Sequence, residues 1–134
     1  MTRPVTPLLA VDIIIRCRDG YVLIERKNEP FGCALPGGFV DVGETLEHAA
    51  LREAREEVGL DVHNIKFFRF YDSPNRDPRG HTVSAVFVGF AIGAPIANDD
   101  AKIAFVSKLP DEDLKRLVFD HRRILVDYTG GFVP

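Results

Sequence analysis

Three glutamates stand close together in the middle of the chain, at a spacing that could hold a cation. Glu53, Glu56 and Glu57 occupy positions i, i+3 and i+4, which are neighbours on one face of a helix. Like charges at this spacing repel one another, so a fold that keeps all three needs a positive group to offset them. A divalent cation bound by carboxylate oxygens is the simplest such group. A metal site is therefore the first hypothesis.

The helix that carries these glutamates can be bounded from its sequence. Thr45 is a good N-cap residue, and Gly59 suits the left-handed position that ends a helix. An apolar stripe recurs at every fourth residue between them: Leu46, Ala50, Ala54 and Val58. At about 100° per residue, Glu53 and Glu57 fall on the same side as this stripe, with Glu56 at its edge. A solvated surface helix would carry its carboxylates on the opposite side, so that alternative fits poorly.

The run from Gly38 to Leu60 resembles the Nudix box, the signature of the Nudix hydrolase family. Its pattern is Gly, five residues, Glu, seven residues, then Arg-Glu-apolar-x-Glu-Glu-x-Gly-apolar, and every fixed position is filled. Ala54 is the mildest match, because it is a small residue at an apolar position. The preceding Leu-Pro-Gly-Gly segment, residues 35–38, also resembles the way these domains enter the box. A pattern with so many fixed positions is highly specific.

The resemblance implies an α/β/α sandwich with a mixed β-sheet and a site that hydrolyses a diphosphate with Mg²⁺ or Mn²⁺. The metal ligands that it implies are three side chains and one backbone carbonyl: Glu53, Glu56, Glu57 and the carbonyl of Gly37. Arg52 would orient the carboxylates through ion pairs, with Glu44 or Glu56 as its partner. Hard cations prefer oxygen ligands, and they neutralise a diphosphate and lower the pKa of the water that attacks phosphorus.

A second segment with functional potential is the polar loop over residues 72–84, which contains Arg76, Arg79 and His81. Guanidinium groups bind phosphate or ribose oxygens through paired hydrogen bonds, so these three residues are candidate substrate contacts. The alternative is a solvent-exposed loop whose arginines pair with the loop's own aspartates. The flanking prolines lead us to expect Arg76 at the tip of the loop.

Parts of this loop and of the C-terminal third resemble the small ADP-ribose pyrophosphatases of the Nudix family. The matching segments are Asp77–Ser84, Asp99–Ala101 and Phe119–His121. Nudix domains in regulators and fusion proteins share them, so these matches are less specific than the box. Nudix enzymes often place an extra carboxylate, as general base or metal ligand, where this chain has Asp99 and Asp100. We take Asp100 as the candidate, although the family often has Glu there and the identity of the base stays open.

Four further side chains are weaker candidates. Arg26 ends an expected strand, where it could face a phosphate or simply cap the surface. Phe31 or Phe39 could stack on a nucleotide base, although core packing is the default for any one of ten phenylalanines. His121 is expected to organise the C-terminal helix rather than to contact substrate.

The rest of the sequence predicts the elements that must position these residues. Strands are expected over residues 8–17, 21–26, 34–36, 65–71, 82–92 and 102–106. Asp19-Gly20 is a strong hairpin signal between the first two strands. A helical turn is expected from Pro110 to Leu114 and a helix from Asp120 to Tyr128. We predict one domain over residues 1–134.

Length and composition fit a single globular enzyme domain. The 134 residues are 46% hydrophobic and 28% charged, with a net charge of −3. The negative net charge argues against non-specific nucleic-acid binding. The chain contains no run of about 18 apolar residues, the length that a membrane span would need. The N-terminus is too short and proline-rich for a signal peptide, and Cys17 and Cys33 suit small core thiols. We therefore expect a cytoplasmic protein, and we leave its oligomeric state open, with a homodimer among the alternatives.

Three functions are compatible with these observations. The first is metal-dependent hydrolysis of ADP-ribose to AMP and ribose 5-phosphate. The second is the same chemistry on another nucleotide diphosphate, such as a nucleoside triphosphate, which could be oxidised, or a sugar nucleotide. The third is a non-catalytic Nudix module that senses ADP-ribose. The complete set of Glu53, Glu56 and Glu57 argues against the third, because a sensor has no need of a hydrolytic metal site.

Overall fold

The computed structural model describes residues 2–130, which contain seven strands and three helices. The strands are β1 (Leu8–Cys17), β2 (Gly20–Arg26), β3 (Cys33–Ala34), β4 (Gly37–Phe39), β5 (His63–Tyr71), β6 (Thr82–Ala91) and β7 (Ala101–Ser107). The helices are α1 (Leu46–Val58), α2 (Asp111–Leu114) and α3 (His121–Thr129). Five of the six predicted strands are confirmed with ends within two residues of their expected positions. The predicted domain also includes Met1 and residues 131–134, which lie outside the described residues.

All seven strands join one mixed sheet. The main path runs β3-β2-β1-β6-β5, while β4 pairs with β1 and β7 pairs with β2. β1 and β6 are parallel over their full length, from Leu8 opposite Thr82 to Cys17 opposite Ala91, and the other pairs are antiparallel. β1 is thus a central strand, which explains why it reads as an almost continuous apolar run.

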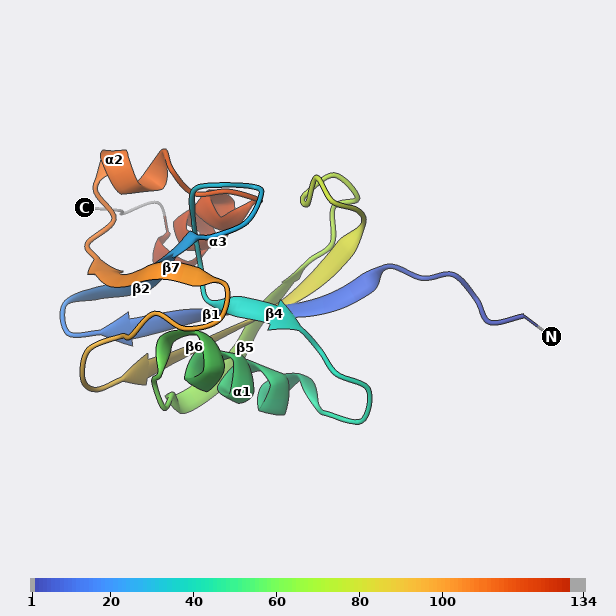
Figure 1. Cartoon of the computed structure of the whole chain (residues 1–134), viewed down its shortest axis with the longest axis horizontal. Helices are drawn as coiled ribbons and strands as arrows, with labels where there is room; N and C mark the ends of the chain where they lie inside the picture. The colour runs from blue at the N-terminus through green and yellow to red at the C-terminus, as the bar shows by residue number, and fades with distance from the viewer. Residues whose placement is uncertain (1, 131–134) are drawn as a thin grey trace.

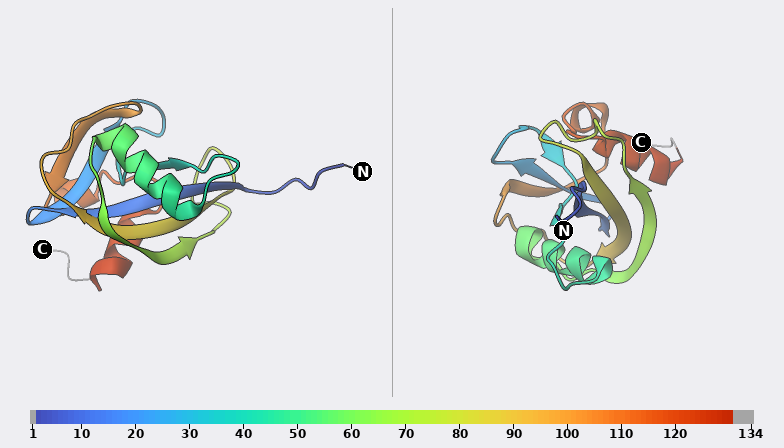
Figure 2. Two further views of the ribbon diagram at one scale, coloured as in Figure 1. Left: turned by 90° about the horizontal axis from the view of Figure 1, so that it is seen from below. Right: turned by 90° about the vertical axis from the view of Figure 1, so that its right-hand side faces the viewer.

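Helices cover the two faces of this sheet, as predicted for a sandwich (Figure 2). Successive side chains of a strand point to opposite faces, so β1 supplies both cores. Ile13 and Ile15 pack in one core with Ala54 of α1, whereas Ile14 packs in the other with Ile124 of α3. The α/β/α sandwich with a mixed sheet is therefore confirmed, with α1 on one face and α3 on the other.

The two ends of α1 follow from its capping residues. The hydroxyl of Thr45 accepts a hydrogen bond of 3.1 Å from the His48 N–H, so the helix begins as predicted. Gly59 has a φ of 67° and its N–H bonds to the Ala54 and Arg55 carbonyls, which ends the helix in the left-handed conformation. Both caps are local, and together they set the phase of the helix and hence the direction of its glutamates.

The short strand predicted over residues 34–36 is the one element that the structure revises. β3 stops at Ala34 because the Leu35 N–H donates to the His121 ring instead of to a strand. Pro36 has no N–H to contribute to a ladder. The chain then re-enters the sheet as β4, where Gly37 and Gly38 lie opposite Asp12 and Val11 of β1. This change of partner strand brings the two glycines beside α1.

Other features of the fold agree with the sequence. Cys17 and Cys33 are buried free thiols, as expected for core residues. Residues 2–7 precede β1 as an exposed extension that projects away from the sheet (Figure 1). Within residues 2–130, no helix is long and apolar enough to cross a membrane.

Candidate active site

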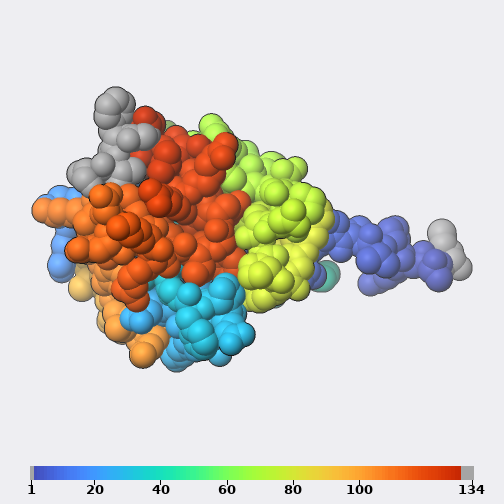
Figure 3. Space-filling view, turned by 90° about the horizontal axis from the view of Figure 1, so that it is seen from above, coloured from blue at the N-terminus to red at the C-terminus, as the bar shows by residue number. Residues whose placement is uncertain are grey.

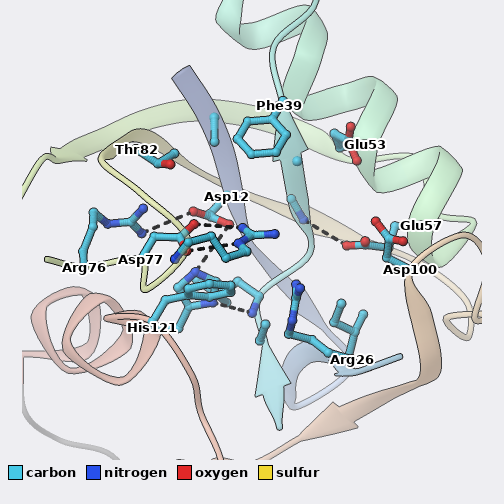
Figure 4. Close-up of a pocket in the computed structure, with 18 of the residues that line it drawn as sticks. Asp12, Arg26, Phe39, Glu53, Glu57, Arg76, Asp77, Thr82, Asp100 and His121 are labelled. Atoms are coloured by element: carbon cyan, nitrogen blue, oxygen red, sulfur yellow. Dashed lines mark hydrogen bonds and ion pairs between the residues drawn. The ribbon is translucent and has the colours of Figure 1, made fainter. Parts of the chain in front are cut away.

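A cleft of about 300 Å³ lies between the α1 face of the molecule and the loop that connects β5 to β6. It is lined from the α1 side by Glu53 and Glu57, and from the loop side by Arg76, Asp77 and Arg79. Glu53, Glu57 and Asp100 lie on one side of the close-up, and Arg76, Asp77 and His121 on the other (Figure 4). The two segments that the sequence singled out therefore meet in one place.

Glu57 is the most buried of the acids on α1. Its side chain faces β4, and Oε1 accepts a hydrogen bond of 3.0 Å from the Gly37 N–H. The residue is only 4% exposed. Burial, and then the negative charges of Glu53 and Asp100, raise the pKa of Glu57 to about 8 despite this hydrogen bond. Burial also raises the pKa of Glu53. The α1 side of the cleft thus concentrates negative charge that the protein does not fully neutralise.

Gly37 and Gly38 of β4 have no side chains, which leaves space for the neighbouring carboxyl groups. A Cβ on Gly38 would lie 2.5 Å from the Glu53 carboxyl group. A Cβ on Gly37 would collide with the Val11 carbonyl and the Asp12 carboxylate. A side chain at position 37 would therefore push β4 away from β1, and one at position 38 would displace the Glu53 carboxyl group.

Arg52 organises the other carboxylates of this region. It donates to both oxygens of Glu44, at 2.5 and 3.0 Å, to Glu53 at 2.9 Å and to Glu56 at 3.1 Å. A further bond of 3.1 Å reaches the Phe39 carbonyl on β4. The bonds to Arg52 lower the pKa of Glu44 to about 2. The sequence offered Glu44 or Glu56 as partner, and the structure shows that Arg52 contacts both and holds Glu53 as well.

The three glutamates of α1 that the sequence singled out do not share one environment. Glu53 and Glu57 line the cleft, whereas the Glu56 side chain is 49% exposed and does not line it. Asp100, from the turn before β7, supplies a third acid to the same side of the cleft. Within residues 2–130, no three His, Cys, Asp or Glu side chains are already grouped closely enough to surround an ion.

The donor chemistry on this side of the cleft nevertheless fits a hard divalent cation. Glu53, Glu57 and Asp100 offer carboxylate oxygens, which Mg²⁺ and Mn²⁺ prefer. The raised pKa values of Glu53 and Glu57 reflect burial beside like charges, a situation that a bound cation would relieve.

On the loop side, the expectation that Arg76 lies at an exposed tip is wrong. Arg76 is 8% exposed, and its Nε and Nη2 donate to Asp120 at 2.9 and 2.6 Å. Asp12 lies 3.8 Å from the same guanidinium. The loop folds inward because these two acids attract Arg76, so that the loop rests against the start of α3 (Figure 3).

Arg79 and His81 differ in their relation to the cleft. Arg79 lines it, and Asp77 accepts hydrogen bonds from the Arg79 Nε at 3.0 Å and Nη2 at 2.8 Å. The Arg79 side chain is still 47% exposed. His81 is exposed, is not among the lining residues, and places a ring nitrogen 3.1 Å from the Asp72 carbonyl.

The structure also shows which of the weaker candidates, Arg26, Phe31 and Phe39, line the cleft. Arg26 lines the cleft while its Nε donates to the Pro30 carbonyl at 2.9 Å. Phe39 lines the cleft and is 44% exposed, whereas Phe31 is 65% exposed and lies outside it. Of the two phenylalanines considered for base stacking, the structure thus brings only Phe39 to the site.

A buried polar group beneath the cleft was missed by sequence reasoning. Ser84 donates to the Asp12 carboxylate at 2.5 Å, and His121 Nε2 lies 3.5 Å from its other oxygen. Burial alone would raise the pKa of Asp12, but His121, Ser84 and Arg76 together hold it below its usual value. Because His121 Nδ1 accepts the Leu35 N–H at 2.9 Å, its ring proton lies on Nε2, toward Asp12. The available signal was a single Asp inside the apolar run of β1.

Comparison with known proteins identifies relatives over nearly the whole chain. The family model described as NUDIX domain matches residues 6–128. An ADP-ribose pyrophosphatase of Methanocaldococcus jannaschii is 50% identical over 125 residues, which cover 91% of this chain and 73% of that protein.

Solved structures agree in fold. A MutT/nudix family protein from Enterococcus faecalis superposes with a TM-score of 0.82 at 33% identity, over 94% of this chain and 62% of that one. The NUDIX domain of Shewanella oneidensis NrtR, solved in complex with ADP ribose, superposes with a TM-score of 0.80 at 26% identity, over 93% of this chain and 88% of that one.

Proposed function

The chain belongs to the NUDIX domain family and is a Nudix hydrolase, and we propose that it hydrolyses ADP-ribose to AMP and ribose 5-phosphate with Mg²⁺ or Mn²⁺. One observation carries the proposal. A single cleft has three acidic side chains on one side, Glu53, Glu57 and Asp100, of which only Glu53 is paired with an arginine in the described part of the chain, and the guanidiniums of Arg26 and Arg79 among its other lining residues. A metal-bound diphosphate needs both kinds of group. The likeness to an ADP-ribose pyrophosphatase supports the choice of substrate.

The proposed metal-holding groups are the carboxylates of Glu53 and Glu57 and the Gly37 carbonyl. When bound, the ion would neutralise the diphosphate and lower the pKa of a water molecule. Glu56 is exposed and bound to Arg52, so we propose that it acts through Arg52 rather than as a direct ligand.

Arg52 is proposed as a positioning residue. It bonds Glu44, Glu53 and the β4 backbone at once, so it fixes the Glu53 carboxylate relative to the glycines of β4. A planar guanidinium can make these contacts in several directions together, which a lysine cannot.

Asp100 is the proposed general base. It lines the cleft on the same side as Glu57, and its negative charge contributes to the raised pKa of Glu57. A carboxylate held there can accept a proton from a water molecule that attacks the diphosphate.

The loop side is proposed to bind substrate. Arg79 and Arg26 line the cleft and can donate N–H groups to phosphate or ribose oxygens. Arg76 is fully engaged with Asp120, so we propose that it supports the loop rather than touches substrate. His81, bonded to the loop backbone, is given the same structural role. The proposal further takes residues 1–134 as one cytoplasmic domain that acts on a small molecule, without nucleic acid or membrane.

The test is a hydrolysis panel in Mg²⁺ that compares ADP-ribose with dinucleotides, nucleoside triphosphates and sugar nucleotides, with products identified by chromatography. We expect the highest kcat/KM for ADP-ribose, with AMP and ribose 5-phosphate as products. A clear preference for another diphosphate would replace the substrate and keep the chemistry. Tight ADP-ribose binding without turnover of any compound would instead favour a sensing module.

A further inference from the structure

His121, the first residue of α3, accepts a hydrogen bond from the link between β3 and β4. Its Nδ1 accepts the Leu35 N–H at 2.9 Å, and both residues are only 2% exposed. Leu35 comes just after the end of β3, so no strand bonds its N–H. Because a buried N–H without a partner is costly, His121 supplies the acceptor that a neighbouring strand would otherwise supply.

The next two residues of the chain connect this link to the carboxylates of α1. The Pro36 carbonyl accepts the Ile13 N–H at 2.9 Å, and Gly37 lies opposite Asp12 of β1. In an antiparallel ladder with these bonds, Gly37 belongs to a non-hydrogen-bonded pair, so its N–H and its carbonyl both point away from β1. The Gly37 N–H accordingly reaches Glu57 at 3.0 Å. The direction of the Gly37 carbonyl is therefore set by the path of the link.

Sheet pairing brings His121 to this link. The Cys33 N–H of β3 donates to the Arg116 carbonyl at 2.8 Å, and the Cys33 carbonyl accepts the Val118 N–H at 2.9 Å. Residues 116–118 therefore run beside β3, and α3 begins at His121 shortly after them. The contact between α3 and the link thus depends on the pairing of β3 and not on α3 alone.

The second ring nitrogen of His121 fixes the orientation of the ring. Nε2 lies 3.5 Å from Asp12 Oδ1 (Figure 4). The other oxygen of Asp12 accepts the Ser84 hydroxyl at 2.5 Å, so the carboxylate is itself held in place. One nitrogen of the ring accepts from the link while the other donates toward β1, and a neutral imidazole offers one group of each kind.

We propose that His121 is a positioning residue of the metal site, which sets the path of residues 35–37 by accepting the Leu35 N–H and so directs the Gly37 carbonyl. The inference rests on the proposed function, because this carbonyl is a metal-holding group only under that proposal. It adds that a residue of α3, on the opposite face of the sheet from α1, helps to hold the ion. Residues that orient metal ligands change metal affinity although they do not touch the ion.

Two substitutions separate the contacts of the two ring nitrogens. Asparagine places its side-chain oxygen near the position of Nδ1, so His121→Asn keeps an acceptor for Leu35 and gives up the contact with Asp12. Glutamine extends to the position of Nε2, so His121→Gln does the reverse. Both remove the ring, so they should lose similar packing. His63→Gln is the control, because His63 is an exposed histidine of β5 that does not line the cleft.

Mn²⁺ alone is the probe, and electron paramagnetic resonance gives its Kd from the signal of the free ion. We expect His121→Gln to weaken Mn²⁺ binding about tenfold, and His121→Asn to stay within about twofold of the wild type. Urea unfolding should show similar losses of stability in the two variants, and His63→Gln should match the wild type in both measurements. Equal Mn²⁺ affinity in the two His121 variants, or a weaker affinity in His121→Asn, would overturn the proposal.

A measurement on the unaltered protein does not depend on how His121→Gln folds. Amide hydrogen exchange followed by NMR, with and without Mg²⁺, reports how often the Leu35 and Gly37 amides open. Coupling between two sites acts in both directions, so Mg²⁺ should slow exchange at both amides. Slower exchange at Gly37 with no change at Leu35 would overturn the proposal.

These results also distinguish the inference from the proposed function. A wild-type protein that binds neither Mn²⁺ nor Mg²⁺ would refute the proposed metal site, and the inference with it. Mn²⁺ binding by the wild type, with equal affinity in the two His121 variants, would refute the inference alone and leave the proposed hydrolysis of ADP-ribose standing.

Discussion

The two sides of the cleft handle charge in opposite ways. On the α1 side, one arginine, Arg52, serves three glutamates, so acids outnumber the cations that face them. On the loop side, Arg76 and Arg79 each have an aspartate of their own, Asp120 and Asp77. The first arrangement leaves negative charge for a cation to neutralise. The second holds guanidiniums in fixed positions while Arg79 stays half exposed toward the cleft.

Arg52 on the α1 side and the buried Arg76 and Asp12 on the other side also differ in how far along the chain their partners lie. Arg52 and Glu44 are 8 residues apart, whereas Arg76 and Asp120 are 44 residues apart and Asp12 and Ser84 are 72 apart. Substitutions should therefore act differently on each side. We expect catalysis to be lost on the α1 side, and substrate affinity or stability to be lost on the loop side.

The largest effect is expected from Glu57→Gln. The amide keeps the shape of the side chain but removes the charge that binds a cation. Loss of a residue that only supports a metal ligand typically lowers activity about ten- to a hundredfold, so loss of a direct ligand should lower kcat by more than about a hundredfold. The melting temperature should hold or rise, because the buried carboxylate already has a raised pKa. Steady-state kinetics and thermal unfolding measure the two quantities.

Glu47→Gln is the matched control, because Glu47 is an exposed glutamate in the first turn of the same helix. It should keep wild-type kinetics. A folded Glu57→Gln enzyme with full activity would refute the metal assignment, and so would wild-type activity that survives excess EDTA.

Arg52→Lys comes next. Lysine retains the positive charge but cannot reach Glu44, Glu53 and the Phe39 carbonyl together. We expect kcat to fall about ten- to a hundredfold, as for other residues that orient metal ligands, with a smaller change in KM. Arg55→Lys, an exposed arginine of the same helix, is the control. Unchanged kinetics in Arg52→Lys would reduce its role to that of a surface residue.

Whether a feature of the fold or site could be predicted from the sequence depends on how far apart in the chain the interacting residues lie. The caps of α1 and the direction of Glu53 and Glu57 follow from helical spacing, and they were predicted. The inward fold of Arg76 was not, because it depends on Asp120 and Asp12, which only tertiary packing brings close. β4 was missed for a similar reason, since Gly37 and Gly38 pair with β1 through a register that no local pattern encodes.

Arg79→Ala tests the loop side. A charge-assisted hydrogen bond contributes about 1.5–3 kcal/mol, so kcat/KM for ADP-ribose should fall about ten- to a hundredfold. The loss should be smaller for a shorter nucleotide that lacks the terminal ribose, if Arg79 contacts that ribose. Arg122→Ala, an exposed arginine on α3, provides the comparison. Equal losses for both substrates would point instead to a contact with the diphosphate.

Arg76→Ala should affect catalysis less and folding more. Removing a side chain that is 4% exposed leaves Asp120 without its guanidinium partner and takes away one of the three groups that face Asp12. Loss of one member of a buried ion pair costs about 3 kcal/mol or more, so the melting temperature should drop by several degrees. Denaturant unfolding of the variant measures this cost. A stable Arg76→Ala protein with a large defect in kcat/KM would return Arg76 to the list of substrate contacts.

His81→Ala should have the smallest effect. His81 is exposed and bonded to the Asp72 carbonyl, so we expect kcat/KM to change by less than about twofold and stability by less than about 0.5 kcal/mol. A tenfold loss in kcat/KM would show that the loop moves when substrate binds and that His81 then reaches it.

The most direct test of the central claim, that both sides of one cleft hold one diphosphate, is a crystal structure with Mn²⁺ and a non-hydrolysable ADP-ribose analogue. Anomalous scattering locates the metal without ambiguity. The account predicts Mn²⁺ bound by Glu53 and Glu57, with the diphosphate reaching from the metal to Arg79 or Arg26. Mn²⁺ bound elsewhere, or an analogue that lies outside the cleft, would contradict it.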